Sequence, residues 1–152
     1  MRIVPGDLDD PRVVDLLRLH LAGMRANSPA GHVFALDLSG LKQPGISFFT
    51  AWQGETLVGM GALKELDSRL GEIKSMRTHP DHLRRGIAAQ ILEHLIGISR
   101  LRGYGRLSLE TGSGASFEPA LALYRRRGFV NGPAFGDYVA SAFNQFLHLE
   151  LS

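Results

Sequence analysis

The chain contains no cysteine among its 152 residues, so it forms no disulfide and offers neither a thiolate metal site nor a cysteine nucleophile. Long apolar runs are also missing, because no stretch approaches the roughly 20 apolar residues that cross a bilayer. The first ten residues, MRIVPGDLDD, lack the apolar region of a signal peptide. We therefore expect a cytoplasmic protein without a membrane partner.

An excess of one charge sign is missing as well. The chain has 17 Lys and Arg against 15 Asp and Glu, a formal net charge of +2. Arginines gather in the second half, where they could attract a polyanionic ligand. The aromatic-rich strands that stack nucleic-acid bases are absent, so we expect no nucleic-acid partner. The six histidines lack metal-ligand spacing, and we expect no metal.

The hydrophobic periodicity predicts one α/β (α+β) domain, residues 1–152, around a central sheet. The segment 33–41 fits either a short helix or an ordered loop. Strand patterns cover residues 1–4, 46–53, 56–66, 71–78, 106–111, 129–130 and 143–151. One helical pattern begins at Pro11 and is broken by Asn27-Ser28-Pro29. Two more helical patterns cover residues 85–102 and 119–127.

The most informative segment lies between the predicted strand 71–78 and the helix after it. The strand ends near Thr78, Pro80 turns the chain, and the helix begins beside the small residues Gly86 and Ala88. A helix N-terminus has unpaired N–H groups and a positive dipole end, which suit a pyrophosphate. The segment matches neither the Walker motif nor G-x-G-x-x-G. An ordinary strand–turn–helix with basic surface residues would fit the same pattern.

Two motifs in the second half resemble those of the GNAT superfamily of N-acetyltransferases. Residues 83–88 are similar to its acetyl-CoA motif, Q/R-x-x-G-x-G/A, with Leu83 in the Q/R position. Residues 120–129 are similar to its A-x-x-L-Y-x-x-x-G-F segment, with Phe117 where the family often has Asn. The resemblance implies a GNAT-like fold, a mixed, mostly antiparallel twisted sheet of six or seven strands flanked by about four helices.

A narrower resemblance involves residues 72–80, 108–112 and 135–138. These segments are similar to small bacterial YsnE-like acetyltransferases.

The resemblance implies direct transfer of the acetyl group of acetyl-CoA to a primary amine of a small molecule or peptide. A catalytically silent module that binds acetyl-CoA as a sensor or partner is the alternative. Dimers are common in the superfamily, which leaves a homodimer open. The cofactor-binding residues implied by the resemblance are Met76, Arg77, Thr78, Arg84, Arg85, Gly86, Ile87, Ala88, Ala89, Phe117 and Tyr124.

Acetyl transfer to an amine needs a base for the amine and an acid for the leaving thiolate. The resemblance implies that the acid is Tyr124, whose phenol has an ordinary pKa of about 10. Glu72 aligns with the catalytic carboxylate of histone-type members, although a place at the start of a strand could simply expose it. Glu110, at the end of the neighbouring strand, is a rival base that could act through water.

The acceptor side is the part that the sequence defines least. In the superfamily it is formed by the first helices, the loop 28–41 and the last hairpin. Asp37 or Asp137 would suit a cationic amine, although a loop Asp often only forms a turn. The substrate-binding candidates are His32, Phe34, Glu110, Asp137 and Tyr138.

Overall fold

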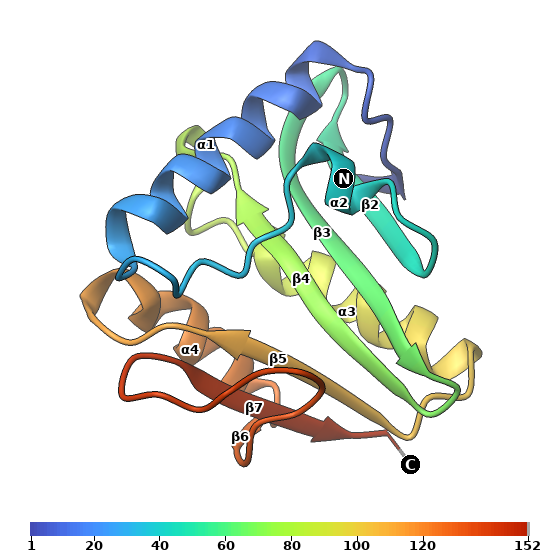
Figure 1. Cartoon of the computed structure of the whole chain (residues 1–152). Coiled ribbons are helices and arrows are strands. Elements are labelled where there is room, and N and C mark those ends of the chain that lie inside the picture. Colours follow the sequence, from blue (N-terminus) through green and yellow to red (C-terminus); the bar gives the residue numbers. More distant parts are fainter. Residues whose placement is uncertain (152) are drawn as a thin grey trace.

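A twisted sheet of seven strands forms the centre of the protein, and the computed structural model describes residues 1–151 of the chain (Figure 1). The strands are β1 Arg2–Pro5, β2 Ile46–Gln53, β3 Thr56–Asp67, β4 Leu70–Thr78, β5 Arg106–Thr111, β6 Val130–Asn131 and β7 Gln145–Glu150. The α-helices are α1 Pro11–Asn27, α2 Leu38–Leu41, α3 Ile87–Leu101 and α4 Glu118–Arg126. Short 3₁₀ turns cover Pro80–His82 and Ala115–Phe117.

The strand order is β1-β2-β3-β4-β5-β7-β6, and every neighbouring pair is antiparallel except β4 and β5. The predicted mixed, mostly antiparallel sheet with four helices is therefore confirmed. The parallel pair is short, because β4 and β5 pair only from Leu70 to Glu72 on β4 and from Arg106 to Ser108 on β5. Beyond Glu72 the two strands separate, as Figure 1 shows toward the left of the view.

The helices begin where the sequence supplies capping groups. The Asp10 side chain accepts a hydrogen bond from the Arg12 N–H at 2.9 Å, and Pro11 occupies the first turn of α1, where it has no N–H to leave unpaired. The segment 33–41 is mostly loop, with only the single turn α2 in helical form. A turn this short forms because Asp37 caps it, accepting from the Gly40 N–H at 2.8 Å.

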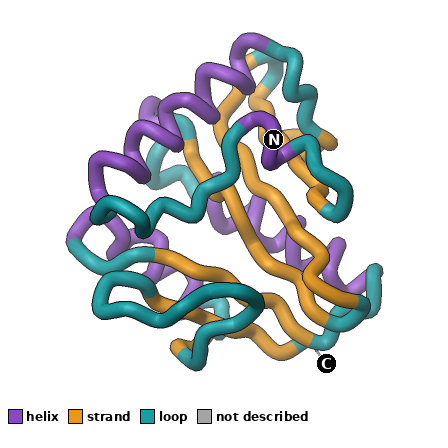
Figure 2. The backbone as a smooth tube through the Cα atoms, in the orientation of Figure 1, coloured by secondary structure: helices purple, strands orange, loops and turns teal. Residues whose placement is uncertain are grey.

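Helices cover both faces of the sheet, so that three layers are stacked (Figure 2). On one face, α1 and α2 pack Val13, Leu16, Leu17 and Leu41 against β2 and β3. On the other face, α3 and α4 contribute Ile87, Ile91, Leu95, Leu121 and Tyr124 to a larger apolar cluster. Alternate residues of each central strand point to opposite clusters, because the side-chain period of a strand is two.

Helix α3 lies close to the sheet because β3 carries glycines beneath it. A Cβ atom at Gly61 would lie 2.7 Å from Ile91 Cγ2, and one at Gly59 would lie 2.8 Å from Ile91 Cδ1. This close contact holds the second turn of α3 against β3.

The loop between β6 and β7 covers the β5–β7 part of the sheet on the α1 face. Its aromatic rings Phe135 and Tyr138 pack edge-on or tilted against Phe146, with ring centroids 5.9 and 5.8 Å apart. No helix among residues 1–151 is both long and apolar enough to cross a membrane.

Candidate active site

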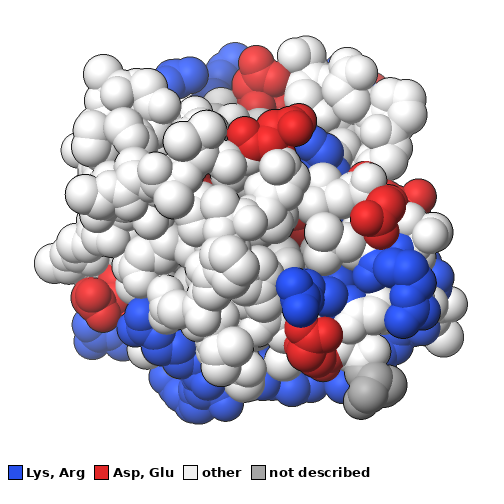
Figure 3. All heavy atoms as spheres, turned by 60° about the horizontal axis from the view of Figure 1, so that its bottom comes forward, with Lys and Arg blue, Asp and Glu red and all other residues white. Residues whose placement is uncertain are grey.

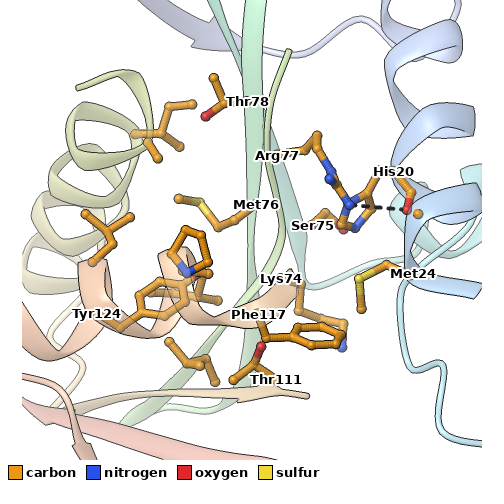
Figure 4. A pocket seen from close by; sticks show the side chains of 18 of the residues that line it. His20, Met24, Lys74, Ser75, Met76, Arg77, Thr78, Thr111, Phe117 and Tyr124 are labelled. Carbon is orange, nitrogen blue, oxygen red and sulfur yellow. Dashed lines mark hydrogen bonds between the residues drawn. The ribbon is translucent and has the colours of Figure 1, made fainter. Parts of the chain in front are cut away.

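A cavity of about 740 Å³ opens where β4 and β5 separate, and it continues through the gap to both faces of the sheet. Figure 4 looks into it, with α3 and α4 on one side of β4 and α1 on the other. The α3 side is lined by Met76, Thr78, Leu83, Arg84, Gly86, Ile87, Ala88, Ala89, Phe117 and Tyr124. The α1 side is lined by His20, Gly23, Met24, Asn27, Phe34, Ala35, Glu72, Lys74, Ser75, Arg77 and Glu110.

The turn before α3 presents a row of free N–H groups to the cavity. Arg84 and Gly86 have left-handed backbones, with φ of 63° and 76°, and Gly86 is the N-cap residue of α3. Within residues 1–151, no N–H group from Arg84 to Ala89 donates to a backbone carbonyl or to a side chain. Together with the positive end of the helix dipole, these donors form a cradle for an anion such as a phosphate.

The edge of β4 that faces β5 is unpaired from Ile73 to Thr78, because the parallel ladder ends at Glu72. Its N–H and C=O groups can therefore pair with an extended ligand that enters the gap. Met76 and Thr78 point from this edge toward α3 in Figure 4.

A bulge in β4 reverses the alternation of its side chains. The register shifts between Met60 and Ala62 of β3, so that Ser75 and Met76 lie opposite one residue, and Ser75 has φ of 57°. As a result, Ser75 and Arg77 both lie on the α1 side, as Figure 4 shows.

Tyr124 extends from α4 toward the gap (Figure 4). Its ring is buried and packs edge-on against Phe129 at 5.7 Å between centroids. Burial raises the pKa of Tyr124, so the phenol is protonated at neutral pH. The hydroxyl makes no hydrogen bond within residues 1–151, which leaves its proton available to a ligand.

Phe117, from the 3₁₀ turn before α4, lines the cavity. Its ring is 7% exposed and lies 5.6 Å from that of Phe143. A phenyl ring offers an apolar wall at a position where an amide side chain would offer hydrogen bonds.

On the α1 side, Arg77 is held by His20 of α1. The Arg77 Nε donates to His20 Nδ1 at 2.9 Å, and Nη2 donates to the His20 carbonyl at 3.5 Å. Burial, reinforced by the Arg77 charge, lowers the pKa of His20 to about 4. The imidazole is therefore neutral at neutral pH and can accept this hydrogen bond.

Glu72 is buried, with a relative exposure of 2%, and does not lie free at the start of its strand. Its Oε2 accepts from Lys74 Nζ at 3.2 Å and from the Tyr138 hydroxyl. The Tyr138 hydroxyl also accepts from Lys74 Nζ at 2.9 Å. Burial and the nearby Glu72 charge raise the pKa of Tyr138, so it remains a donor. Glu72, Lys74 and Tyr138 form a closed polar triad.

Glu110 lies on the same face, near the triad but outside its hydrogen bonds. Burial raises the pKa of Glu110 to about 7, although the nearby Lys74 charge acts in the opposite direction. A carboxyl group with this pKa exchanges its proton near neutral pH, which is the property that a general base needs.

Most of the predicted site residues share this cavity, but a few do not line it. Arg85 points to His82, with Nη1 and Nδ1 3.1 Å apart, and Asp137 is exposed on the β6–β7 loop. His32 is a half-buried residue that packs against Phe34, at 6.5 Å between ring centroids. Tyr138 reaches the lining only through Glu72 and Lys74.

Sequence reasoning missed His20, Lys74 and Ser75, which the structure brings to the α1 side. The first two left a signal in the sequence. His20 is a polar residue on the buried face of an amphipathic helix, and Lys74 stands two residues after Glu72, which places the two side chains on one face of a strand.

Within residues 1–151, no group of three or more His, Asp or Glu side chains is placed to hold a metal ion. On the face that Figure 3 shows, Lys and Arg form separate patches with acidic residues between them, and a broad uncharged area lies beside these patches.

The chain is similar to known proteins in sequence and in structure. The acetyltransferase (GNAT) family matches residues 13–129. Two curated relatives, both described as uncharacterised N-acetyltransferases, are YsnE of Bacillus subtilis and YedL of Escherichia coli. YsnE is 53% identical over 91% of each chain, and YedL is 44% identical over 98% of this chain and 94% of its own.

Among solved structures, a Bacillus subtilis acetyltransferase in complex with CoA superposes with a TM-score of 0.74. It is 20% identical to this chain, with 99% of each chain covered.

Proposed function

The chain belongs to the acetyltransferase (GNAT) family and is an acyltransferase, and on that premise we propose that it transfers the acetyl group of acetyl-CoA directly to a primary amine in this cavity. One observation carries the proposal. A single cavity joins the free N–H groups of Arg84 to Ala89 with the phenol of Tyr124 and the carboxyl group of Glu110.

The α3 side suits the coenzyme. The N–H groups from Arg84 to Ala89 would hold the pyrophosphate, and the free edge of β4 would pair with the extended pantetheine arm. That arm would run through the gap and bring the thioester between Tyr124 and Glu110. The apolar wall at Phe117 would exclude water from the thioester.

Glu110 is the proposed general base. An amine enters as an ammonium ion and must lose a proton before it can attack, and a carboxylate with a pKa of about 7 can accept that proton near neutral pH. Glu72 is less suited, because Lys74 and Tyr138 already donate hydrogen bonds to it. Glu72 instead holds the side chains of Lys74 and Tyr138 in position. Glu110 contacts the amine directly or through one water.

Tyr124 is the proposed general acid. The new N–C bond forms as the C–S bond breaks, and the sulfur leaves as a thiolate that requires a proton. The Tyr124 hydroxyl has no competing acceptor within residues 1–151 and can donate that proton. The nitrogen loses its second proton in the same step, and that proton restores the Tyr124 phenol through solvent.

The test separates an enzyme from a silent binding module. Calorimetry should show acetyl-CoA binding to the wild type and to Tyr124→Phe with similar affinity. Release of free CoA thiol on an amine panel should occur with the wild type and fall about 10²- to 10⁴-fold in Tyr124→Phe, the usual range for a lost general acid. Binding without amine-dependent thiol release would favour the silent module, and no binding at millimolar acetyl-CoA would contradict both.

A further inference from the structure

We propose that the acceptor amine carries a carboxylate, which binds the Arg77 guanidinium and the Ser75 hydroxyl on the α1 side of the cavity. This inference rests on the proposed function and names the class of its acceptor.

Arg77 is a partly buried cation without an acidic partner. No carboxylate oxygen among residues 1–151 lies within 4.0 Å of its guanidinium. Its protein hydrogen bonds go to the neutral His20 ring and, at 3.5 Å, to a carbonyl, so Nη1 is free and Nη2 is weakly bound. A desolvated cation is costly unless an anion compensates it. An anionic ligand group at this position would supply that compensation.

The other cation on this side is already neutralised. Lys74 Nζ lies 3.2 Å from Glu72 Oε2, and both side chains are at least nine-tenths buried. An anion entering the α1 side therefore meets one unpaired positive charge, that of Arg77.

Ser75 gives a second and independent observation. Its residue is 8% exposed, its Oγ has no hydrogen-bond partner, and it lines the cavity on the same side as Arg77. A buried hydroxyl without a partner is rare in proteins and calls for an explanation. The left-handed backbone of Ser75 in the β4 bulge brings this hydroxyl to the Arg77 side. A carboxylate can accept hydrogen bonds from both groups.

Helix α1 leaves room for the guanidinium. A Cβ atom at Gly23 would lie 3.2 Å from Arg77 Nη2, so a side chain there would press on the guanidinium. A glycine inside a helix costs about 1 kcal/mol relative to alanine. Its presence opposite Arg77 is explained by the need to keep the guanidinium in place, with His20 one helical turn away.

The carboxylate is favoured over other anions by the planar fork of Arg77. Two parallel N–H donors match two carboxylate oxygens, and on Arg77 Nη1 is free while Nη2 makes only one long hydrogen bond. With Glu110 on the same side of the cavity, one acceptor can place its acid group on Arg77 and its amine near the base.

The experiment uses amino acids with one to four carbons between amine and carboxylate, each compared with its own carboxamide. Binding is measured by calorimetry on the CoA-saturated protein, in which no transfer takes place, and turnover is measured separately with acetyl-CoA. The binding experiment tests the acceptor class, whereas the turnover experiment tests the proposed function. Failure of one can therefore be told from failure of the other.

We expect at least one amino acid to bind about 10- to 100-fold more tightly than its carboxamide, the range for a charged hydrogen-bonded pair. Arg77→Gln should remove that preference, Arg77→Lys should keep part of it, and Ser75→Ala should reduce it several-fold. Arg25→Gln, which removes an exposed cation of α1 outside the cavity lining, is the matched control and should keep the full preference.

Equal binding of acids and carboxamides, or no binding of any acid to the CoA-saturated wild type, would overturn the proposal. A loss of more than tenfold in CoA affinity in Arg77→Gln would also overturn it, because Arg77 would then act on the coenzyme. Circular dichroism and the midpoint of urea unfolding verify that each variant is folded.

Discussion

The two sides of the cavity present different chemical groups, although both border the strand β4. The α3 side offers mainly backbone groups, the free N–H donors from Arg84 to Ala89 and the unpaired edge of β4, together with apolar walls. The α1 side offers side chains that titrate or carry charge, among them His20, Arg77 and Glu110. Backbone donors suit a ligand that is always the same, whereas side chains can be exchanged to suit a particular acceptor.

The division implies that substitutions on one side should leave the function of the other side intact.

Replacement of Glu110 by Gln should have the largest effect. If Glu110 is the base, kcat/KM for the amine should fall about 10²- to 10⁴-fold while the Kd for acetyl-CoA stays within twofold. In the wild type, kcat/KM should rise with pH to a limit set by a pKa of about 7, because only the deprotonated carboxyl group accepts a proton. This rising limb of the pH profile of kcat/KM should vanish in Glu110→Gln.

Glu72→Gln serves as the comparison, because it removes a neighbouring carboxylate and keeps its shape. It should retain the rising limb. If it loses the limb while Glu110→Gln keeps it, the base is Glu72 and our assignment is wrong.

Acid should destabilise the fold through His20 on the α1 side. The pKa of His20 is about 4 in the folded protein and about 6.5 when unfolded, so the unfolded chain binds more protons between these values. The contribution of His20 is complete above pH 6.5, and it is lost as the pH falls toward 4. The loss amounts to about 3 kcal/mol in the free energy of unfolding.

Urea unfolding at several pH values measures this contribution, and His20→Gln should flatten the dependence between pH 6.5 and 4. Acetyl-CoA binding by folded His20→Gln should be unchanged. A weaker affinity would mean that the contact between His20 and Arg77 on the α1 side also affects coenzyme binding on the α3 side.

Gly86→Ala tests the α3 side by itself. Gly86 has φ of 76°, and an added Cβ would meet no atom within 4 Å, so the substitution strains the backbone without a clash. A left-handed conformation costs a non-glycine residue about 1–2 kcal/mol. We expect acetyl-CoA to bind about 5- to 30-fold more weakly, with kcat at saturating acetyl-CoA little changed.

Gly97→Ala is its matched control, since Gly97 lies inside α3 and also has free space around its Cα. It should leave the acetyl-CoA affinity unchanged and raise the stability slightly. Equal effects of the two variants would mean that the turn at Gly86 is not a specific binding element.

Tyr138→Phe should have the smallest effect. It removes the hydroxyl that donates to Glu72 and accepts from Lys74 but keeps the packing of the ring against Phe146. A single hydrogen bond contributes about 1 kcal/mol, so the amine KM should change a few-fold. The affinity for acetyl-CoA should not change. A weaker affinity would mean that Tyr138, which contacts α1-side residues, also acts on the coenzyme.

The strand, turn and helix that form the α3 side could be predicted from the sequence because they are local in the chain. The turn, the helix N-terminus and the small residues Gly86 and Ala88 lie within a few positions, and backbone geometry follows from such short patterns. The strands and the longer helices were found for the same reason, since each depends on its own periodicity.

The α1 side was predicted poorly because it is assembled from distant segments. His20 and Arg77 are 57 positions apart, and Tyr138 lies 66 positions from Glu72. Whether Glu72 is exposed or buried depends on the β6–β7 loop that covers it, and no short pattern reveals that contact. The bulge at Ser75, which turns Ser75 and Arg77 to the same side, leaves no clear signal in the sequence either.

The most direct test of the division is the acetyl-CoA affinity of a protein changed on the α1 side alone. Calorimetry on the double variant Arg77→Gln/Glu110→Gln, beside the wild type, measures it in one experiment. We predict a Kd for acetyl-CoA within twofold of the wild-type value, together with loss of amine-dependent thiol release. A Kd more than tenfold weaker in a folded double variant would contradict the account, because the coenzyme would then depend on the α1 side.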